Sequence, residues 1–331
     1  MTASYLVTGG AGFIGSHLTD ALLARGDRVV ALDSLSTGRL ANLDHAGGHP
    51  QCRFVQGSVL DELVVDELVH ECDVVVHLAA AVGVKLIVEH PLRSLTTNIR
   101  GSEIMIEAAH RYRRKILLAS TSEIYGRNSA ESLHEGSDRI LGSPTVSRWA
   151  YSTAKALDET LAYAYHKERG LPTVVVRLFN TVGPRQSAAY GMVIPRLARQ
   201  AVAGGALTVY GDGNQRRCFC HVGDVVRGLL GVLDHPKAVG DVFNLGSAEE
   251  ISIMDLAHRI VARAESSAKV ELIPYEQAYE PGFEDMYRRR PDTTKVRNLI
   301  GWAPTRTLDD ILDEVIAEAR LEMALGADAP T

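Results

Sequence analysis

The chain has 331 residues, and its 41 acidic and 35 basic side chains give a formal charge of −6. With 46% hydrophobic and 23% charged residues it can bury a large core, which excludes intrinsic disorder, and its mild acidity argues against nucleic-acid binding. No apolar run approaches the ~18 residues of a membrane span, and no export signal marks the N-terminus, so we expect a cytoplasmic protein with no membrane partner.

The first half of the chain alternates short β-rich runs with longer amphipathic stretches. The predicted strands cover Tyr5–Thr8, Arg28–Leu32, Arg53–Gln56, Val74–Leu78, Ile116–Ser120 and Thr173–Leu178. The predicted helices cover Phe13–Arg25, Asp61–His70, Pro91–Arg113 and Ser147–Arg169. Such alternation predicts an α/β fold, a doubly wound parallel sheet of the Rossmann type with helices on both faces.

The regular alternation of strand and helix patterns ends at about residue 180, after which glycine-rich turns separate shorter elements. We therefore predict a dinucleotide-binding Rossmann domain over 1–180, a smaller C-terminal α/β lobe for the substrate over 181–320, and a flexible tail over 321–331. The boundary leaves room for the chain to return to the sheet after residue 180. Tyr275–Arg290 has no clear period and is predicted as a loop over a site.

A glycine-rich turn links the first predicted strand to the first helix. Gly9, Gly12 and Gly15 are spaced as GxxGxxG, which permits a tight turn and close approach of a pyrophosphate to the helix N-terminus. Asp33 ends the second strand, where a carboxylate bonds the adenosine ribose and repels a 2′-phosphate. Together these features predict NAD rather than NADP.

Two polar groups are candidates for catalysis. Tyr151 and Lys155 lie four residues apart and share one helix face, where the cation would favour the phenolate of a tyrosine acting as base. Thr121, Ser122 and Glu123 follow the fifth strand, at the sheet edge where open α/β sheets bind ligands. Without the glycine-rich turn upstream, the first group would read as a half-exposed helix pair and the second as a helix cap.

With these motifs the chain resembles the extended short-chain dehydrogenase/reductase family, whose members use NAD+ to oxidise a nucleotide sugar transiently at C4. The resemblance runs from about residue 4 to about 315 and includes His77-Leu78-Ala79-Ala80, Arg177-Leu178-Phe179-Asn180 and Gly183-Pro184-Arg185. The cofactor-binding residues that it implies are Gly9, Gly12, Phe13, Ile14, Gly15, Asp33, Ser34, Thr37, Gly38, Ser58, Val59, Leu78, Ala79, Ala80, Asn98, Tyr151 and Lys155. Ser58 stands where many relatives have an aspartate near the adenine.

Within that family, Thr121-Ser122-Glu123 resembles the segment of UDP-glucuronic acid decarboxylases, and Arg289 matches their arginine before a basic-Pro pair. Arg148–Tyr151 and Gly282–Asp285 favour the members that release a 4-keto-pentose. The implied catalytic residues are Thr121, Ser122, Glu123, Tyr151, Lys155 and Arg289. The implied UDP-sugar-binding residues are Asn180, Arg185, Tyr210, Gln215, Arg217 and Arg289.

The carboxylate on C5 beside a C4 ketone is a β-keto acid, which loses CO2 through an enolate, so we expect no metal. A UDP-sugar 4-epimerase or dehydratase with the same oxidation step is the alternative, and a non-catalytic NAD-binding regulator is a third. The sequence does not decide whether the 4-keto intermediate is released or is reduced to UDP-xylose.

The resemblance also implies a homodimer through Pro91–Arg113 and Ser147–Arg169, with Ile104, Ile106, Leu157 and Leu161 as candidate surface residues. The four cysteines are expected to be reduced thiols.

Overall fold

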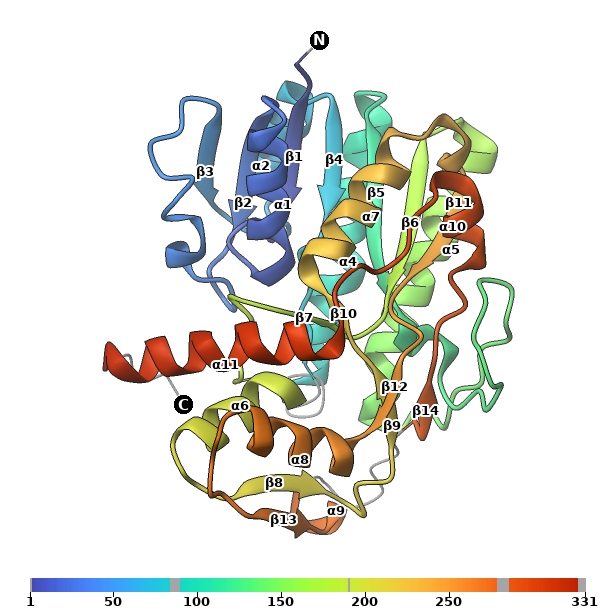
Figure 1. Cartoon of the computed structure of the whole chain (residues 1–331). Coiled ribbons are helices and arrows are strands. Elements are labelled where there is room, and N and C mark those ends of the chain that lie inside the picture. The colour runs from blue at the N-terminus through green and yellow to red at the C-terminus, as the bar shows by residue number, and fades with distance from the viewer. Residues whose placement is uncertain (1, 84–89, 190, 279–285, 327–331) are drawn as a thin grey trace.

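A computed structural model describes residues 2–83, 90–189, 191–278 and 286–326. Within these residues, seven parallel strands form the main sheet in the order β11-β6-β5-β4-β1-β2-β3 (Figure 1). The strands are β1 (Ser4–Thr8), β2 (Arg28–Asp33), β3 (Cys52–Gln56), β4 (Val74–His77), β5 (Lys115–Thr121), β6 (Thr173–Leu178) and β11 (Asp241–Leu245). The predicted doubly wound parallel sheet is confirmed. Its strand order reverses between β1 and β4, where such sheets bind ligands.

Helices cover both faces of the sheet. On one face α1 (Phe13–Ala24) and α7 (Val222–Asp234) pack over β1, β4 and β6 in one hydrophobic core. On the other face α2 (Glu62–Glu71), α4 (Pro91–Arg111) and α5 (Ala150–Arg169) bury a second core. Strands covered on both sides explain the apolar runs of their sequences.

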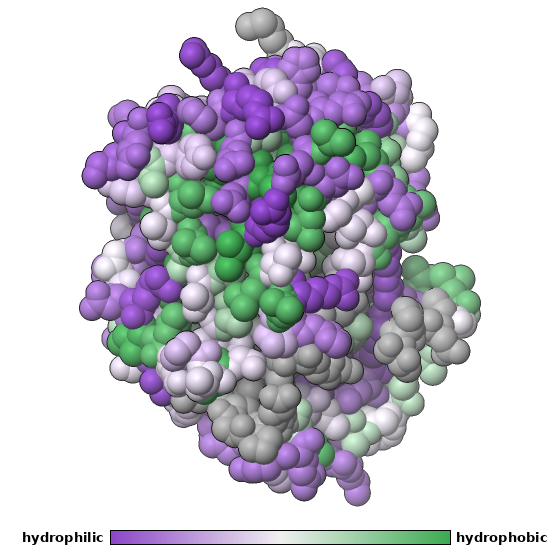
Figure 2. All heavy atoms as spheres, turned by 180° about the vertical axis from the view of Figure 1, so that it is seen from behind, coloured by the Kyte–Doolittle hydropathy of each residue, from purple (hydrophilic) through white to green (hydrophobic). Residues whose placement is uncertain are grey.

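Two of the residues predicted for a dimer surface belong to that second core. Ile106 is fully buried and Ile104 is 7% exposed, so neither can form part of an outer surface. Leu157 remains 48% exposed on α5. Figure 2 shows the molecule from behind the view of Figure 1, with hydrophobic residues interspersed among hydrophilic ones on this side.

The C-terminal elements build a smaller lobe below the carboxyl edge of the sheet (Figure 1). They are β7 (Thr181–Val182), α6 (Val193–Val202), β8 (Leu207–Tyr210), β9 (Arg216–Cys218), β10 (Cys220–His221), β12 (Glu250–Ser252), α8 (Ile253–Arg263), β13 (Val270–Ile273), α9 (Tyr275–Ala278), β14 (Arg288–Arg289) and α11 (Leu308–Ala324). Helices α6, α8 and α11 share a third core with β8. In contrast, β11 and α10 (Thr294–Ile300) return to the main sheet and its flanking helix α7.

Two regions differ from their predictions. Tyr275–Arg290 is not simply a loop, because it begins with the short helix α9 and ends in β14, whose Arg289 pairs in register with Arg217 of β9. The segment Gly282–Asp285, noted for its resemblance, lies outside the described residues.

The predicted tail is helical beyond Leu321, since α11 starts at a Thr307–Asp310 capping box and continues to Ala324. Within the described part of the chain, no helix is both long and apolar enough to cross a membrane.

Candidate active site

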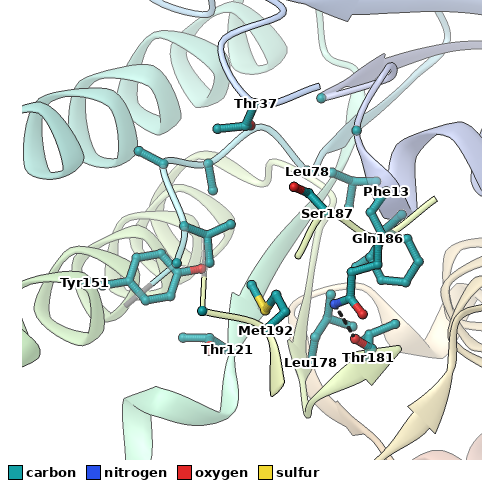
Figure 3. Close-up of a pocket in the computed structure, with 18 of the residues that line it drawn as sticks. Phe13, Thr37, Leu78, Thr121, Tyr151, Leu178, Thr181, Gln186, Ser187 and Met192 are labelled. Atoms are coloured by element: carbon teal, nitrogen blue, oxygen red, sulfur yellow. Dashed lines mark hydrogen bonds between the residues drawn. The ribbon is translucent and has the colours of Figure 1, made fainter. Parts of the chain in front are cut away.

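One pocket of about 1320 Å³ lies between the carboxyl edge of the sheet and the C-terminal lobe. It is large enough to hold a dinucleotide together with a second ligand, beyond the size of a usual small-molecule pocket. All of the predicted site residues line it except Gly38, Asn98 and Lys155. In Figure 3, Tyr151 and Thr121 reach in from one side, and Phe13 and Leu78 lie across the pocket from them.

The glycine-rich turn leaves no room for a Cβ atom at its glycine positions. Gly9 has φ +69°, and a Cβ on Gly15 would lie 2.0 Å from the carbonyl oxygen of Gly9. Gly12 caps α1 without a side-chain hydrogen bond, so the first N–H groups of this helix are not covered by a cap. A phosphate can therefore approach the backbone here closely, with the helix dipole behind it.

Asp33 lies beside this turn at the end of β2. Its carboxylate accepts hydrogen bonds from the N–H groups of Ala11 at 3.0 Å and Leu35 at 2.8 Å. Burial raises the pKa of Asp33, and these backbone donors oppose the rise. Gly38 does not line the pocket, but a Cβ there would come within 2.8 Å of Asp33 Oδ2. Gly38 thus acts by leaving room for this carboxylate.

Tyr151 opens α5 and points its hydroxyl into the pocket (Figure 3). Burial raises its pKa, and the negative charges of Glu123 and Asp158 raise it further. Lys155 is buried one turn along the helix and does not line the pocket; its Nζ donates to Asp158 Oδ2 at 3.1 Å. The predicted Tyr–Lys pair therefore has a buried carboxylate partner, Asp158, which the four-residue spacing did not reveal.

A buried hydrogen-bond chain connects Asp158 to the loop after β4. Asp158 accepts from the Ser102 hydroxyl, Ser102 Oγ lies 3.2 Å from His77 Nε2, and His77 Nδ1 lies 2.9 Å from Thr8 Oγ1. Thr8 Oγ1 in turn accepts from the N–H of Ala79 at 3.1 Å. Burial, aided by Lys155, lowers the pKa of His77 to about 3, so the ring is neutral and donates through Nε2.

Asn98 holds the same loop from a different side. Its side chain accepts from the N–H of Ala81 at 2.8 Å and donates to the carbonyl of Ala81 at 3.1 Å. It does not line the pocket, so its contact with the cofactor stays a prediction. The loop that Asn98 holds supplies Leu78, Ala79 and Ala80 to the pocket wall.

Glu123 lies in a short 3₁₀ turn after β5, η2 (Ser122–Tyr125), next to Tyr151. Arg148 donates hydrogen bonds to both carboxylate oxygens of Glu123, and its Nη2 lies 2.9 Å from Oε1. Arg289 Nη1 lies 3.3 Å from the same Oε1. Burial opposes ionisation of Glu123, but Arg148, Arg289 and Arg217 outweigh it and lower the pKa. Thr121 Oγ1 accepts from the Glu123 N–H at 3.2 Å, so Thr121 also caps the turn.

The C-terminal lobe lines the other end of the pocket. Gln215 donates to the Tyr210 carbonyl at 3.0 Å and to the Tyr275 hydroxyl, and Arg196 lies 4.5 Å from the centre of the Tyr210 ring. Arg217 is held through its Nη1 by the carbonyl of Arg216 at 2.9 Å. These side chains form an amphipathic, positively charged wall suited to a nucleotide.

Asn180 and Arg185 lie between the two ends. Asn180 donates to the Cys218 carbonyl at 2.8 Å, and Arg185 pairs with Asp20 of α1 at 2.9 Å. Both therefore join the Rossmann half to the lobe at the pocket wall.

Four lining residues were not among the predicted site residues: Arg148, which the sequence offered only as part of the segment Arg148–Tyr151, and Arg196, Tyr275 and Met192. Arg148 stands three positions before Tyr151, in the 3₁₀ turn η3 (Ser147–Trp149) that leads into α5, so its place could have been predicted from that of Tyr151. Nothing in the sequence pairs Arg196 with Tyr210. No group of three or more metal-ligating side chains occurs among the residues with described positions.

Residues 5–246 match the model of the NAD dependent epimerase/dehydratase family. The chain is 39% identical to a UDP-N-acetyl-alpha-D-glucosaminuronate decarboxylase of Bacillus cytotoxicus, over 94% of this chain and 96% of that protein. It is 36% identical to UDP-glucuronic acid decarboxylase 1 of Danio rerio, and the match covers 94% of this chain and 71% of that protein.

Among solved structures, a UDP-glucuronic acid 4-epimerase from Bacillus cereus, in complex with UDP-glucuronic acid and NAD, superposes with a TM-score of 0.86. It is 30% identical to this chain, and the match covers 96% of this chain and 99% of that one.

Proposed function

Because the chain belongs to the NAD dependent epimerase/dehydratase family, we propose that it decarboxylates UDP-glucuronic acid after oxidising it at C4 with NAD+. The observation that carries this proposal is the cluster of Glu123, Arg148 and Arg289 beside Tyr151 in the shared pocket. A base that takes the proton of the 4-hydroxyl and an arginine that binds the carboxylate are the two protein groups that such a reaction needs side by side.

The residues present fit the cofactor. The Gly9–Gly15 turn is a cradle that a Cβ would fill, and it would hold the diphosphate at the start of α1. Asp33 would accept from the adenosine ribose, with Ser58 and Val59 toward the adenine. When bound, NAD+ supplies the acceptor for the C4 hydride.

The side chains then divide the work on the sugar. Tyr151 accepts the proton of the 4-hydroxyl, while Lys155, one helical turn away, contributes positive charge. The resulting 4-keto acid loses CO2 when the C5–C6 bond breaks and its electron pair passes into the enolate of the ketone. Arg289 binds the carboxylate before this step, and Thr121 and Ser122 offer hydroxyl donors at the end of β5. A proton from water completes C5.

A second substrate is favoured by one comparison. The relative at 39% identity is named for UDP-N-acetyl-α-D-glucosaminuronate, which carries the same carboxylate and differs at C2. The likeness to a UDP-glucuronic acid 4-epimerase keeps epimerisation as the alternative reaction on a UDP-hexuronic acid.

Incubation of the purified protein with each UDP-hexuronic acid, with added NAD+, tests the proposal by mass spectrometry of the nucleotide sugars. Loss of CO2 from UDP-glucuronic acid is expected, and the mass of the product shows whether the ketone or the reduced pentose is released. Loss of CO2 only from the N-acetylated sugar would move the assignment to the second substrate. An isomer of unchanged mass would establish an epimerase, and no turnover with NAD bound would favour a regulator.

The proposal extends to assembly and compartment. A homodimer through α4 and α5 is supported by the exposed apolar side chain of Leu157, with Leu161 one turn further on the same helix face. The four cysteines are unpaired, which suits a reducing compartment such as the cytoplasm.

A further inference from the structure

Two arginines contact Glu123, but they contact it differently. Arg148 uses both terminal nitrogens on both carboxylate oxygens, the geometry of a forked arginine–carboxylate pair. Arg289 makes one longer contact of 3.3 Å to an oxygen that Arg148 already bonds. Glu123 is therefore held mainly by Arg148.

Burial and chain position reinforce this difference. The Arg148 side chain is 2% exposed, and its guanidinium lies 5.8 Å from the centre of the Trp149 ring. It lies in the turn η3 that leads directly into α5, while Ser152 of α5 donates to the Glu123 carbonyl at 2.8 Å. Glu123 is thus clamped, through its carboxylate and its backbone, to the start of the helix that carries Tyr151.

We propose that Arg148 is a positioning residue that keeps Glu123 an anchored carboxylate, so that Arg289 can turn its guanidinium to the carboxylate of the substrate. The inference rests on the proposed decarboxylation and adds a division of labour within it. Anchored in this way, Glu123 accepts hydrogen bonds, for example from a water that protonates C5, and does not itself donate a proton. Without Arg148, the Glu123 carboxylate would compete with the substrate for Arg289.

The charged and titratable groups around Glu123 set the expected pH dependence. Arg148 faces it from η3, Arg289 from β14, Arg217 from β9 and Tyr151 from α5. Arg148 has the largest effect among the three arginines that lower the pKa of this carboxyl. Its removal should let Glu123 take up a proton at higher pH.

The test compares Arg148→Met, Arg148→Lys and wild type, each loaded with NAD+. We expect the acid limb of kcat/KM for CO2 release from UDP-glucuronic acid to move to higher pH in Arg148→Met, with the plateau reduced about tenfold or more. Arg148→Lys should recover part of both effects, because a point charge replaces the fork. Arg288→Met is the matched control: this neighbouring arginine pairs with Glu250 outside the pocket, and its loss should leave the pH profile unchanged.

A second readout does not depend on turnover. Titration of ¹³C-labelled glutamate carboxyls by NMR, with the Glu123 signal assigned through Glu123→Gln, should show a higher midpoint in Arg148→Met than in wild type. Thermal unfolding checks that the variants are folded, and Arg148→Lys carries the comparison if the methionine variant is not.

The outcomes separate this inference from the proposed function. Equal Glu123 midpoints in wild type and variants would overturn the positioning role, whatever the activity. Shifted midpoints with an unchanged pH profile of CO2 release would also overturn it, because the anchored charge would then serve no step. A wild type that releases no CO2 from UDP-glucuronic acid would refute the proposed function, and shifted midpoints would still establish that Arg148 anchors Glu123.

Discussion

At the scale of single residues, the pocket opposes the ionisation that its proposed chemistry requires. Burial and the charges of Glu123 and Asp158 raise the pKa of Tyr151. A bound nicotinamide would add positive charge beside the phenol and favour the phenolate. The tyrosine is therefore a poor base in the NAD-free protein, and we expect it to act as a base only in the complex.

Removal of the phenolic oxygen tests this role most directly. We expect Tyr151→Phe to retain NAD and to lose CO2 release by about 10²–10⁴-fold, because the variant keeps the ring packing and deletes only the proton acceptor. Initial rates and the NAD content of the purified variant check both parts. Retention of more than about a third of the wild-type rate would assign the base elsewhere.

Arg289 separates decarboxylation from a general oxidation of sugars. We expect Arg289→Met to lose CO2 release by about 10²-fold while NAD binding is unchanged, since in the proposed function the charge binds the substrate carboxylate and not the cofactor. Arg289→Lys should recover only a fraction, because a point charge cannot make two parallel hydrogen bonds. Near-normal CO2 release from the methionine variant would mean that Arg289 does not bind the carboxylate.

At the scale of elements, strand-end residues were predictable and their partners were not. The glycine turn and Asp33 follow from β1, α1 and β2, whose spacing in the sequence already implies their meeting at one sheet edge. Asp158 and Ser102 meet only because α4 and α5 pack side by side, which no local pattern reveals. Likewise, Arg289 reaches Glu123 through the pairing of β14 with β9, across a segment that read as a loop.

The chain of hydrogen bonds through β1, β4 and α4 makes stability depend on pH. The His77 pKa is about 3 in the folded protein, against an ordinary 6.5, so between these values the unfolded chain binds a proton that the folded chain does not. Stability contributed by neutral His77 is present above pH 6.5 and is lost as pH falls toward 3, by up to about 1.4 kcal/mol per pH unit.

His77→Gln should remove this pH dependence. We expect the variant to be less stable than wild type at pH 7, because Thr8 and Ser102 lose their ring partner, by roughly 1–3 kcal/mol. The difference should shrink as pH falls from 6.5 to 4. Urea unfolding of both proteins across that range, at one NAD concentration, gives the comparison; two curves that stay parallel would show that His77 does not carry the effect.

At the scale of the whole molecule, the pocket depends on two lobes with separate cores. The Rossmann half contributes the cofactor turn, and the smaller lobe contributes Tyr210, Gln215 and Arg217. The two are tied by the return of β11 to the sheet and by α11, whose Glu318 accepts from the backbone N–H of Arg185 at 2.6 Å. The contacts that join the two lobes come from packing between distant segments, which composition and spacing do not reveal.

The outer face of α5 leads to the last prediction, which concerns assembly. Leu157, Leu161 and Tyr165 recur every four residues along this helix; Leu157 is 48% exposed, while Leu161 and Tyr165 are partly buried against the second core. If this face pairs with a second copy, as in the proposed homodimer, a charge at its most exposed position becomes buried without a partner. Leu157→Glu should therefore convert a species of about twice 35.9 kDa into the monomer, as measured by light scattering at micromolar concentration. Leu272→Glu on β13 changes an equally exposed leucine, at 52%, on the smaller lobe and should leave the mass unchanged. A wild type that is already monomeric would exclude the interface, and a dimer that persists in Leu157→Glu would place it on another face.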